Sequence, residues 1–146
     1  MKDILNQMTV RFPSRSVNEG FARSAAAAFA AQLDPTLEQL YDLKTAVSEA
    51  VTNAIVHAYP DRVGPVTMTV RIFGDGTVEI TVRDRGIGIS DVKKAREPMY
   101  TTGGAERSGM GFTIMESFMD GLSVRSTPGK GTTIRMRKKL TRREEK

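Results

Sequence analysis

The sequence contains no cysteine, no tryptophan and only one histidine, and it has no long apolar run. The absence of cysteine excludes disulfide bonds and thiolate metal sites. A transmembrane helix would need about 20 consecutive apolar residues, and none are present. Residues 1–7 also lack the apolar core of a secretory signal. These absences predict a cytoplasmic protein that does not associate with a membrane.

The length and composition are typical of one compact domain. The chain has 146 residues, of which 39% are hydrophobic. We expect residues 1–146 to form a single domain, with about 8–138 folded and a basic tail after them. The net charge of +5 is concentrated near the C-terminus, in Arg135, Arg137, Lys138, Lys139, Arg142 and Arg143. No nucleic-acid-binding motif accompanies this basic segment, so we expect a solvated strand end and tail rather than contact with nucleic acid.

Hydrophobic periodicity predicts an α+β fold, a two-layer sandwich with helices on one face of a mixed, mostly antiparallel sheet. Ser16 and Glu19 have the spacing of a capping box at the start of the first helix. Pro35 is favoured as the first residue of the second helix. The predicted strands are 8–12, 66–73, 78–83, 122–126 and 132–138, and the predicted helices are 16–34, 35–58, 91–96 and 111–119.

The second predicted helix has an apolar arc and an opposite polar arc. Glu49 and Asn53 are four residues apart on the polar arc, so their side chains are neighbours. An amide oxygen is a suitable Mg²⁺ ligand, and a carboxylate can act as a general base towards a hydroxyl. The alternative is an ordinary solvated helix face.

Three glycine-containing segments stand at the ends of predicted elements. Asp84, Gly86 and Gly88 follow a strand, where the acid could accept a hydrogen bond from an exocyclic amine; the alternative is a tight turn. A second segment, Ser108-Gly109-Met110-Gly111, precedes a helix, whose free N–H groups suit phosphate; the alternative is a simple loop. The third, residues 129–133, is a hairpin turn entering the last strand.

These four motifs occur in the order found in the Bergerat-type ATP-binding fold, which gyrase-type ATPases, Hsp90, histidine kinases and MutL proteins share. Residues 48–57 and 107–116 more closely resemble the anti-sigma F factors of spore-forming bacteria, and the likeness extends over about 8–138. The resemblance implies a homodimer that binds ATP or ADP with Mg²⁺. It also implies that the protein sequesters a sporulation sigma factor and phosphorylates an anti-anti-sigma protein on serine.

The resemblance also implies roles for individual residues. Glu49 would be the general base and Asn53 the Mg²⁺ ligand, while Asp84 would contact the adenine amine. Arg107 would reach the γ-phosphate from a lid over residues 98–108. The other implied nucleotide contacts are Gly86, Gly88, Thr101, Thr102, Ser108, Gly109, Met110, Gly111 and Thr133, and the implied partner-binding residues are Glu19 and Arg23.

Two alternative functions remain open at this point. Relatives usually have a lysine after the two lid threonines, whereas this chain has Gly103 and Gly104. This departure allows a nucleotide-gated anti-sigma binding module with little phosphotransfer. The other alternative is a stress-response switch kinase acting on another sigma factor. A histidine kinase is not expected, because His57 ends a helix of the domain and no separate phosphoacceptor helix precedes it.

Overall fold

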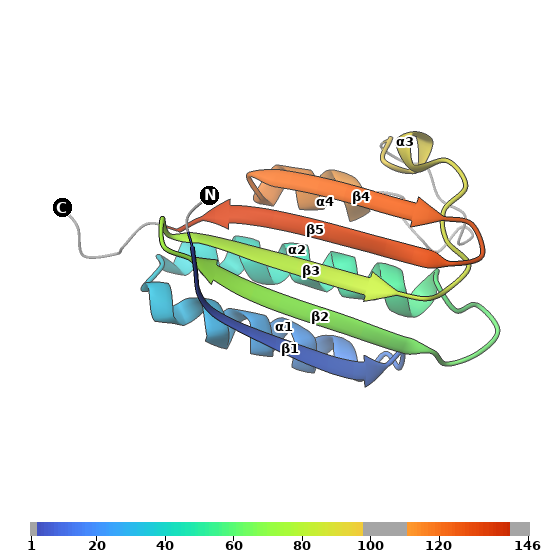
Figure 1. The fold of residues 1–146 in the computed structure, drawn as a ribbon, viewed down its shortest axis with the longest axis horizontal. Helices are drawn as coiled ribbons and strands as arrows, with labels where there is room; N and C mark the ends of the chain where they lie inside the picture. Colours follow the sequence, from blue (N-terminus) through green and yellow to red (C-terminus); the bar gives the residue numbers. More distant parts are fainter. Residues whose placement is uncertain (1–2, 98–110, 141–146) are drawn as a thin grey trace.

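The computed structural model describes residues 3–97 and 111–140. One antiparallel sheet has its longer helices on one side, and Figure 1 looks onto the other side. The strands are β1 (Ile4–Pro13), β2 (Pro65–Phe73), β3 (Thr77–Asp84), β4 (Gly121–Thr127) and β5 (Gly131–Lys139). The helices are α1 (Asn18–Ala30), α2 (Leu37–Val56), α3 (Val92–Ala95) and α4 (Gly111–Phe118), with a short 3-10 turn at Ala31–Leu33.

The strands lie in the order β1-β2-β3-β5-β4. Each pairing between described strands is antiparallel, so the prediction of a mostly antiparallel sheet with helices on one face is confirmed. The predicted strands are all present and differ from the observed ones only at their ends. The turns after β2 and β4 contain Gly76 and Gly129, both with positive φ, which glycine adopts at little cost.

Alternate residues of each strand face the helices and form the core. In β2 these are Val66, Met68, Val70 and Ile72, all almost fully buried. Three alanines of α1, Ala22, Ala26 and Ala30, are fully buried, and their small side chains let this helix pack against α2. The helix layer and the apolar face of the sheet therefore bury each other.

The intervening strand residues form an open face, defined as the sheet face away from the helices (Figure 1). They align in rows that cross all five strands. One row is Arg11, Thr67, Arg83, Thr133 and Arg125. The next is Thr9, Thr69, Thr81, Arg135 and Ser123, and the third is Gln7, Arg71, Glu79, Arg137 and Gly121.

The two predicted helix starts are wrong in detail. Val17 is the N-cap of α1, and no side chain caps this helix. The residues before α1 are already turned, because the Asn18 N–H donates to the Arg15 carbonyl and the Glu19 N–H to the Ser16 carbonyl. The second helix starts after Pro35, with Thr36 as its N-cap and a complete capping box to Gln39.

No helix in the described ranges is long and apolar enough to cross a membrane.

Candidate active site

Helix α2 carries the first part of the candidate site. Its buried stripe includes Leu43, Val47 and Val51, which fix the rotation of the helix over the sheet. Glu49 and Asn53 lie outside this buried stripe, one turn apart, and both are partly exposed. The structure agrees with the predicted polar face.

The start of α4 meets Glu49. A Cβ atom added to Gly111 would lie 3.3 Å from Glu49 Oε1, so the carboxylate reaches the first residue of α4. Two motifs separated by more than a third of the chain are thus brought together. The N-terminus of a helix favours anions, because its first N–H groups have no partner within the helix. This position therefore combines an anion-attracting helix end with a carboxylate.

Asp84 ends β3 on the core face and is 5% exposed. Its Oδ1 accepts hydrogen bonds from the Gly86 N–H at 2.9 Å and the Thr132 N–H at 3.2 Å. Burial raises the pKa of this carboxyl group above its ordinary value, and the two hydrogen bonds act in the opposite direction. Both bonds reach the same oxygen, so the carboxyl group has a fixed orientation.

Gly86 and Gly88 lie so close to backbone atoms of other segments that a side chain would not fit at either position. A Cβ on Gly86 would lie 2.0 Å from the Ala58 carbonyl oxygen, just after α2. Gly88 has φ +80°, and its Cβ would lie 2.4 Å from the Thr127 carbonyl oxygen at the end of β4. These glycines thus let residues 84–89, which we call the Asp84 loop, fit between the end of α2 and the β4–β5 turn.

Two residues that sequence reasoning missed hold this loop. The Tyr59 hydroxyl accepts the Arg85 N–H and donates to the Pro65 carbonyl, each at 2.6 Å. Ser126 Oγ accepts the Ile89 N–H at 2.7 Å. Tyr59 stands in the turn after α2, directly before a proline, and only the tertiary contact distinguishes it from an ordinary core tyrosine.

The structure places Thr133 away from Asp84. Thr133 lies in the open-face row between Arg83 and Arg125, whereas Asp84 is on the core face. The preceding residue, Thr132, pairs with Asp84 on the core face and is 5% exposed. The structure therefore places Thr132, and not the predicted Thr133, beside Asp84.

On α1, the predicted partner-binding residues form an ion pair. Arg23 Nε lies 3.0 Å from Glu19 Oε2, one turn along the helix. Phe21, between them in the sequence, is 55% exposed, and Val17 is 78% exposed. This end of α1 thus combines charge with exposed apolar surface. The remaining predicted site residues are Thr101, Thr102, Arg107, Ser108, Gly109 and Met110, which lie outside the described residues.

The arrangement suits an elongated ligand along α2. Glu49 and the C-cap residue His57 are separated by about 12 Å at 1.5 Å per residue, with the Asp84 loop packed just beyond the helix end. No group of three histidine, cysteine, aspartate or glutamate side chains that could hold a metal occurs among the described residues. Mg²⁺ does not require such a group, because it is commonly bound by few protein oxygens together with substrate phosphates. The amide oxygen of Asn53, one helical turn from the carboxylate of Glu49, is therefore a suitable ligand for Mg²⁺ that is delivered with a nucleotide.

Known proteins resemble this chain in both sequence and fold. Residues 12–138 match the family model of the histidine kinase-like ATPase domain. An anti-sigma F factor of Caldanaerobacter subterraneus subsp. tengcongensis is 56% identical over 138 residues, covering 94% of this chain and 96% of that protein. An anti-sigma F factor of Pasteuria penetrans is 58% identical over 137 residues, covering 92% and 91%.

Among solved structures, the RsbU and RsbW domains of a Mycobacterium tuberculosis protein share the fold with a TM-score of 0.71 at 20% identity. That match covers 94% of this chain and 33% of the other. The mycobacterial sensor histidine kinase MprB matches with a TM-score of 0.58 at 15% identity, over 93% of this chain and 100% of the other. At these identities the two structures establish the fold alone. The sequence relatives establish more: the chain belongs to the anti-sigma F factor family, within the histidine kinase-like ATPase domains.

Proposed function

We propose that this protein is an anti-sigma factor that inhibits a sporulation sigma factor of the F type. We further propose that it phosphorylates an anti-anti-sigma protein on serine with Mg²⁺-ATP, in the cytoplasm. The relatives named anti-sigma F factor support the first part. The observation that carries the second part is the contact of Glu49 with the start of α4, one turn from Asn53.

In this proposal the nucleotide lies along α2 with its base at the Asp84 loop. Asp84 accepts a hydrogen bond from the adenine amine, while Thr132 stands beside the base. Gly111, at the start of α4, leaves room for the phosphates near N–H groups that attract anions. Asn53 holds Mg²⁺, which neutralises charge on the phosphates.

Glu49 acts on the substrate. Its carboxylate accepts the proton of the attacking serine hydroxyl as that oxygen bonds to the γ-phosphorus of ATP, while the bond from this phosphorus to the β-phosphate oxygen breaks and ADP leaves. The site residues outside the described part of the chain, including Arg107, are proposed to close over the phosphates. A guanidinium there would stabilise the charge that spreads over the transferred group.

The protein partners are proposed to bind at the start of α1. Glu19 and Arg23 supply charge, and exposed Phe21 and Val17 supply apolar surface, the combination that favours a specific interface. Both the sigma factor and the anti-anti-sigma protein would use this surface on a homodimer. The nucleotide state would then decide which of them stays bound.

A phosphotransfer assay with radiolabelled ATP, Mg²⁺ and the anti-anti-sigma protein of the same genome tests the proposal. Glu49→Gln is expected to bind ATP within a few-fold of wild type and to lower the phosphotransfer rate by at least ~100-fold, the usual loss for a general base. Glu38→Gln is the matched control, because Glu38 is an exposed glutamate in the first turn of the same helix. This control is expected to keep full activity.

Two results would contradict parts of this proposal. Equal phosphotransfer by wild type and Glu49→Gln would exclude Glu49 as the base. No label from the wild type, with ATP binding shown separately, would leave a nucleotide-gated anti-sigma binding module. Transfer only to the antagonist of a stress-response sigma factor would identify the protein as a switch kinase of that system.

A further inference from the structure

The open face of the sheet has two groups of cations in different electrostatic environments. At one end, Arg71, Arg135 and Arg137 surround the carboxylate of Glu79, with N–O distances of 3.4, 3.8 and 2.9 Å. Glu79 is 4% exposed, so the arginine side chains cover it. The charges of this group are partly compensated within the protein.

At the other end, four cations line a cavity of about 420 Å³. They are Arg83, Arg85, Arg125 and Lys130, and we call this cavity the basic pocket. Within the described ranges none of these four side chains takes part in an ion pair. Of the described residues that line the pocket, only Asp84 is acidic, and its side chain is on the core face and is 5% exposed.

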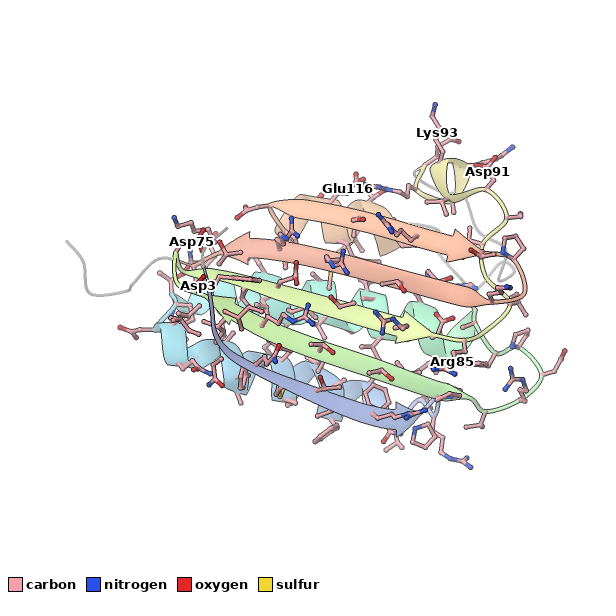
Figure 2. The ribbon with its side chains drawn as sticks, viewed as in Figure 1. Asp3, Asp75, Arg85, Asp91, Lys93 and Glu116 are labelled. Atoms are coloured by element: carbon pink, nitrogen blue, oxygen red, sulfur yellow. The ribbon has the colours of Figure 1, made fainter. Side chains whose placement is uncertain are left out.

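The register of the strands gives the pocket a defined geometry. Thr133 in β5 pairs with Arg83 in β3 on one side and with Arg125 in β4 on the other. Two strand spacings separate these arginine backbones, about 10 Å, with the threonine between them. Arg85 follows the end of β3, where Figure 2 shows it beyond the strand. Lys130 lies in the turn between β4 and β5.

The basic pocket is separate from the proposed nucleotide site. No residue of α2 or α4 lines it, and its cations belong to the open face or to the loops at its end. Within the described residues the two sites meet at the end of β3, where Asp84 and Thr132 contribute to both. Among the described residues that line it there is no aromatic side chain, so they offer a nucleobase no stacking partner.

We propose that the basic pocket binds a phosphate-bearing anion. Guanidinium groups bind phosphate through paired hydrogen bonds, and the threonine hydroxyl between them can donate another. An anion would also relieve the mutual repulsion of four cations that form no ion pair with the described part of the chain. The pocket has room for more than one tetrahedral ion, which favours an oligophosphate or a phosphorylated side chain with its flanking chain. This inference does not depend on the kinase activity.

Titration calorimetry with inorganic pyrophosphate tests the proposal, using the full chain saturated with ADP so that the nucleotide site is occupied. Wild type is expected to bind, and Arg125→Gln and Lys130→Gln should each weaken binding by about 10-fold, the scale of one lost hydrogen bond to a charged group. Arg137→Gln is the matched control. It removes the same charge from the same face, at the end where Glu79 already binds the guanidinium, and should change the affinity by less than about 2-fold.

A second arm distinguishes the source of the phosphate. A phosphoserine peptide that binds more tightly than pyrophosphate, and loses affinity in Arg125→Gln, would identify a phosphorylated protein segment as the ligand. Tighter binding of pyrophosphate than of the phosphoserine peptide would identify a free oligophosphate as the ligand. Equal weakening by Arg125→Gln and Arg137→Gln would overturn the proposal, since it would show only attraction to net charge. Equal binding of a peptide with glutamate in place of phosphoserine, or no binding of either phosphate probe, would also overturn it.

Discussion

Asp84 combines burial with hydrogen bonds that all point to one of its oxygens. Because burial raises its pKa, folding favours the protonated form of this group. Its contribution to the free energy of unfolding is therefore fully present below pH 3.8 and is lost as the pH rises through the raised pKa. At neutral pH the ionised carboxylate is therefore destabilising.

Asp84→Asn separates the effect of this residue on stability from its effect on ATP binding. Asparagine can keep Oδ1 as the acceptor for Gly86 and Thr132, which directs its NH₂ group to where the second carboxylate oxygen stood. Urea unfolding at pH 7 is expected to show equal or greater stability than wild type. ATP affinity, measured by calorimetry, should fall about 10- to 100-fold, because the NH₂ group of the asparagine would face the amine of the adenine and both are hydrogen-bond donors. Because the pKa of Asp84 is raised, the ATP affinity of the wild type should begin to fall, on acidification, at a higher pH than the ordinary aspartate pKa would predict. An ATP affinity of Asp84→Asn equal to that of the wild type would contradict the adenine contact.

At the scale of elements, two segments have the residue spacing of a capping box, but only one of them caps its helix. Thr36 Oγ1 accepts the Gln39 N–H, and Gln39 Oε1 accepts the Thr36 N–H, each at 3.0 Å. Ser16 and Glu19 have the same spacing, but the turn before α1 places Val17 in a helical conformation, and Glu19 pairs with Arg23 instead. Local pattern alone therefore could not tell the working capping box from the inactive one.

Thr36→Ala is expected to lower the free energy of unfolding by about 1 kcal/mol, the usual value of an N-cap. Ser16→Ala, its matched control, should change that free energy by less than about 0.5 kcal/mol, because its side chain caps nothing. Thermal or urea unfolding measures both. A larger loss in Ser16→Ala than in Thr36→Ala would contradict the observed helix starts.

At the scale of the whole molecule, the Asp84 loop joins the helix layer to the sheet. Gly86→Ala would push a methyl group against the Ala58 carbonyl, and we expect a loss of at least about 2 kcal/mol in unfolding free energy together with weaker ATP binding. Gly121→Ala is the control, because nothing lies within 4 Å of its added Cβ. The control should stay within about 1 kcal/mol of wild type. Equal stability of the two variants would show that the loop does not need this close approach.

Sequence periodicity was sufficient to predict the helix and sheet layers and to place Glu49 next to Asn53. The layers follow from the strand and helix repeats, and the position of the two residues follows from the helix repeat. Periodicity was insufficient wherever two distant segments touch. The contact of Glu49 with Gly111, the bridge made by Tyr59 and the face occupied by Thr133 depend on strand register and helix packing. Thr132 and Thr133 are adjacent and chemically alike, so only the register decides which of them faces Asp84.

The alternation of the two sheet faces also limits how the length of this chain can change. A one-residue insertion within β3 or β5 would exchange the faces beyond it, moving arginines such as Arg135 into the core and residues such as Met136 into water. The same insertion would displace the walls of both the nucleotide site and the basic pocket. Insertions and deletions should therefore be tolerated in exposed connections such as residues 60–63, while the strands that separate the two sites keep a constant length during evolution.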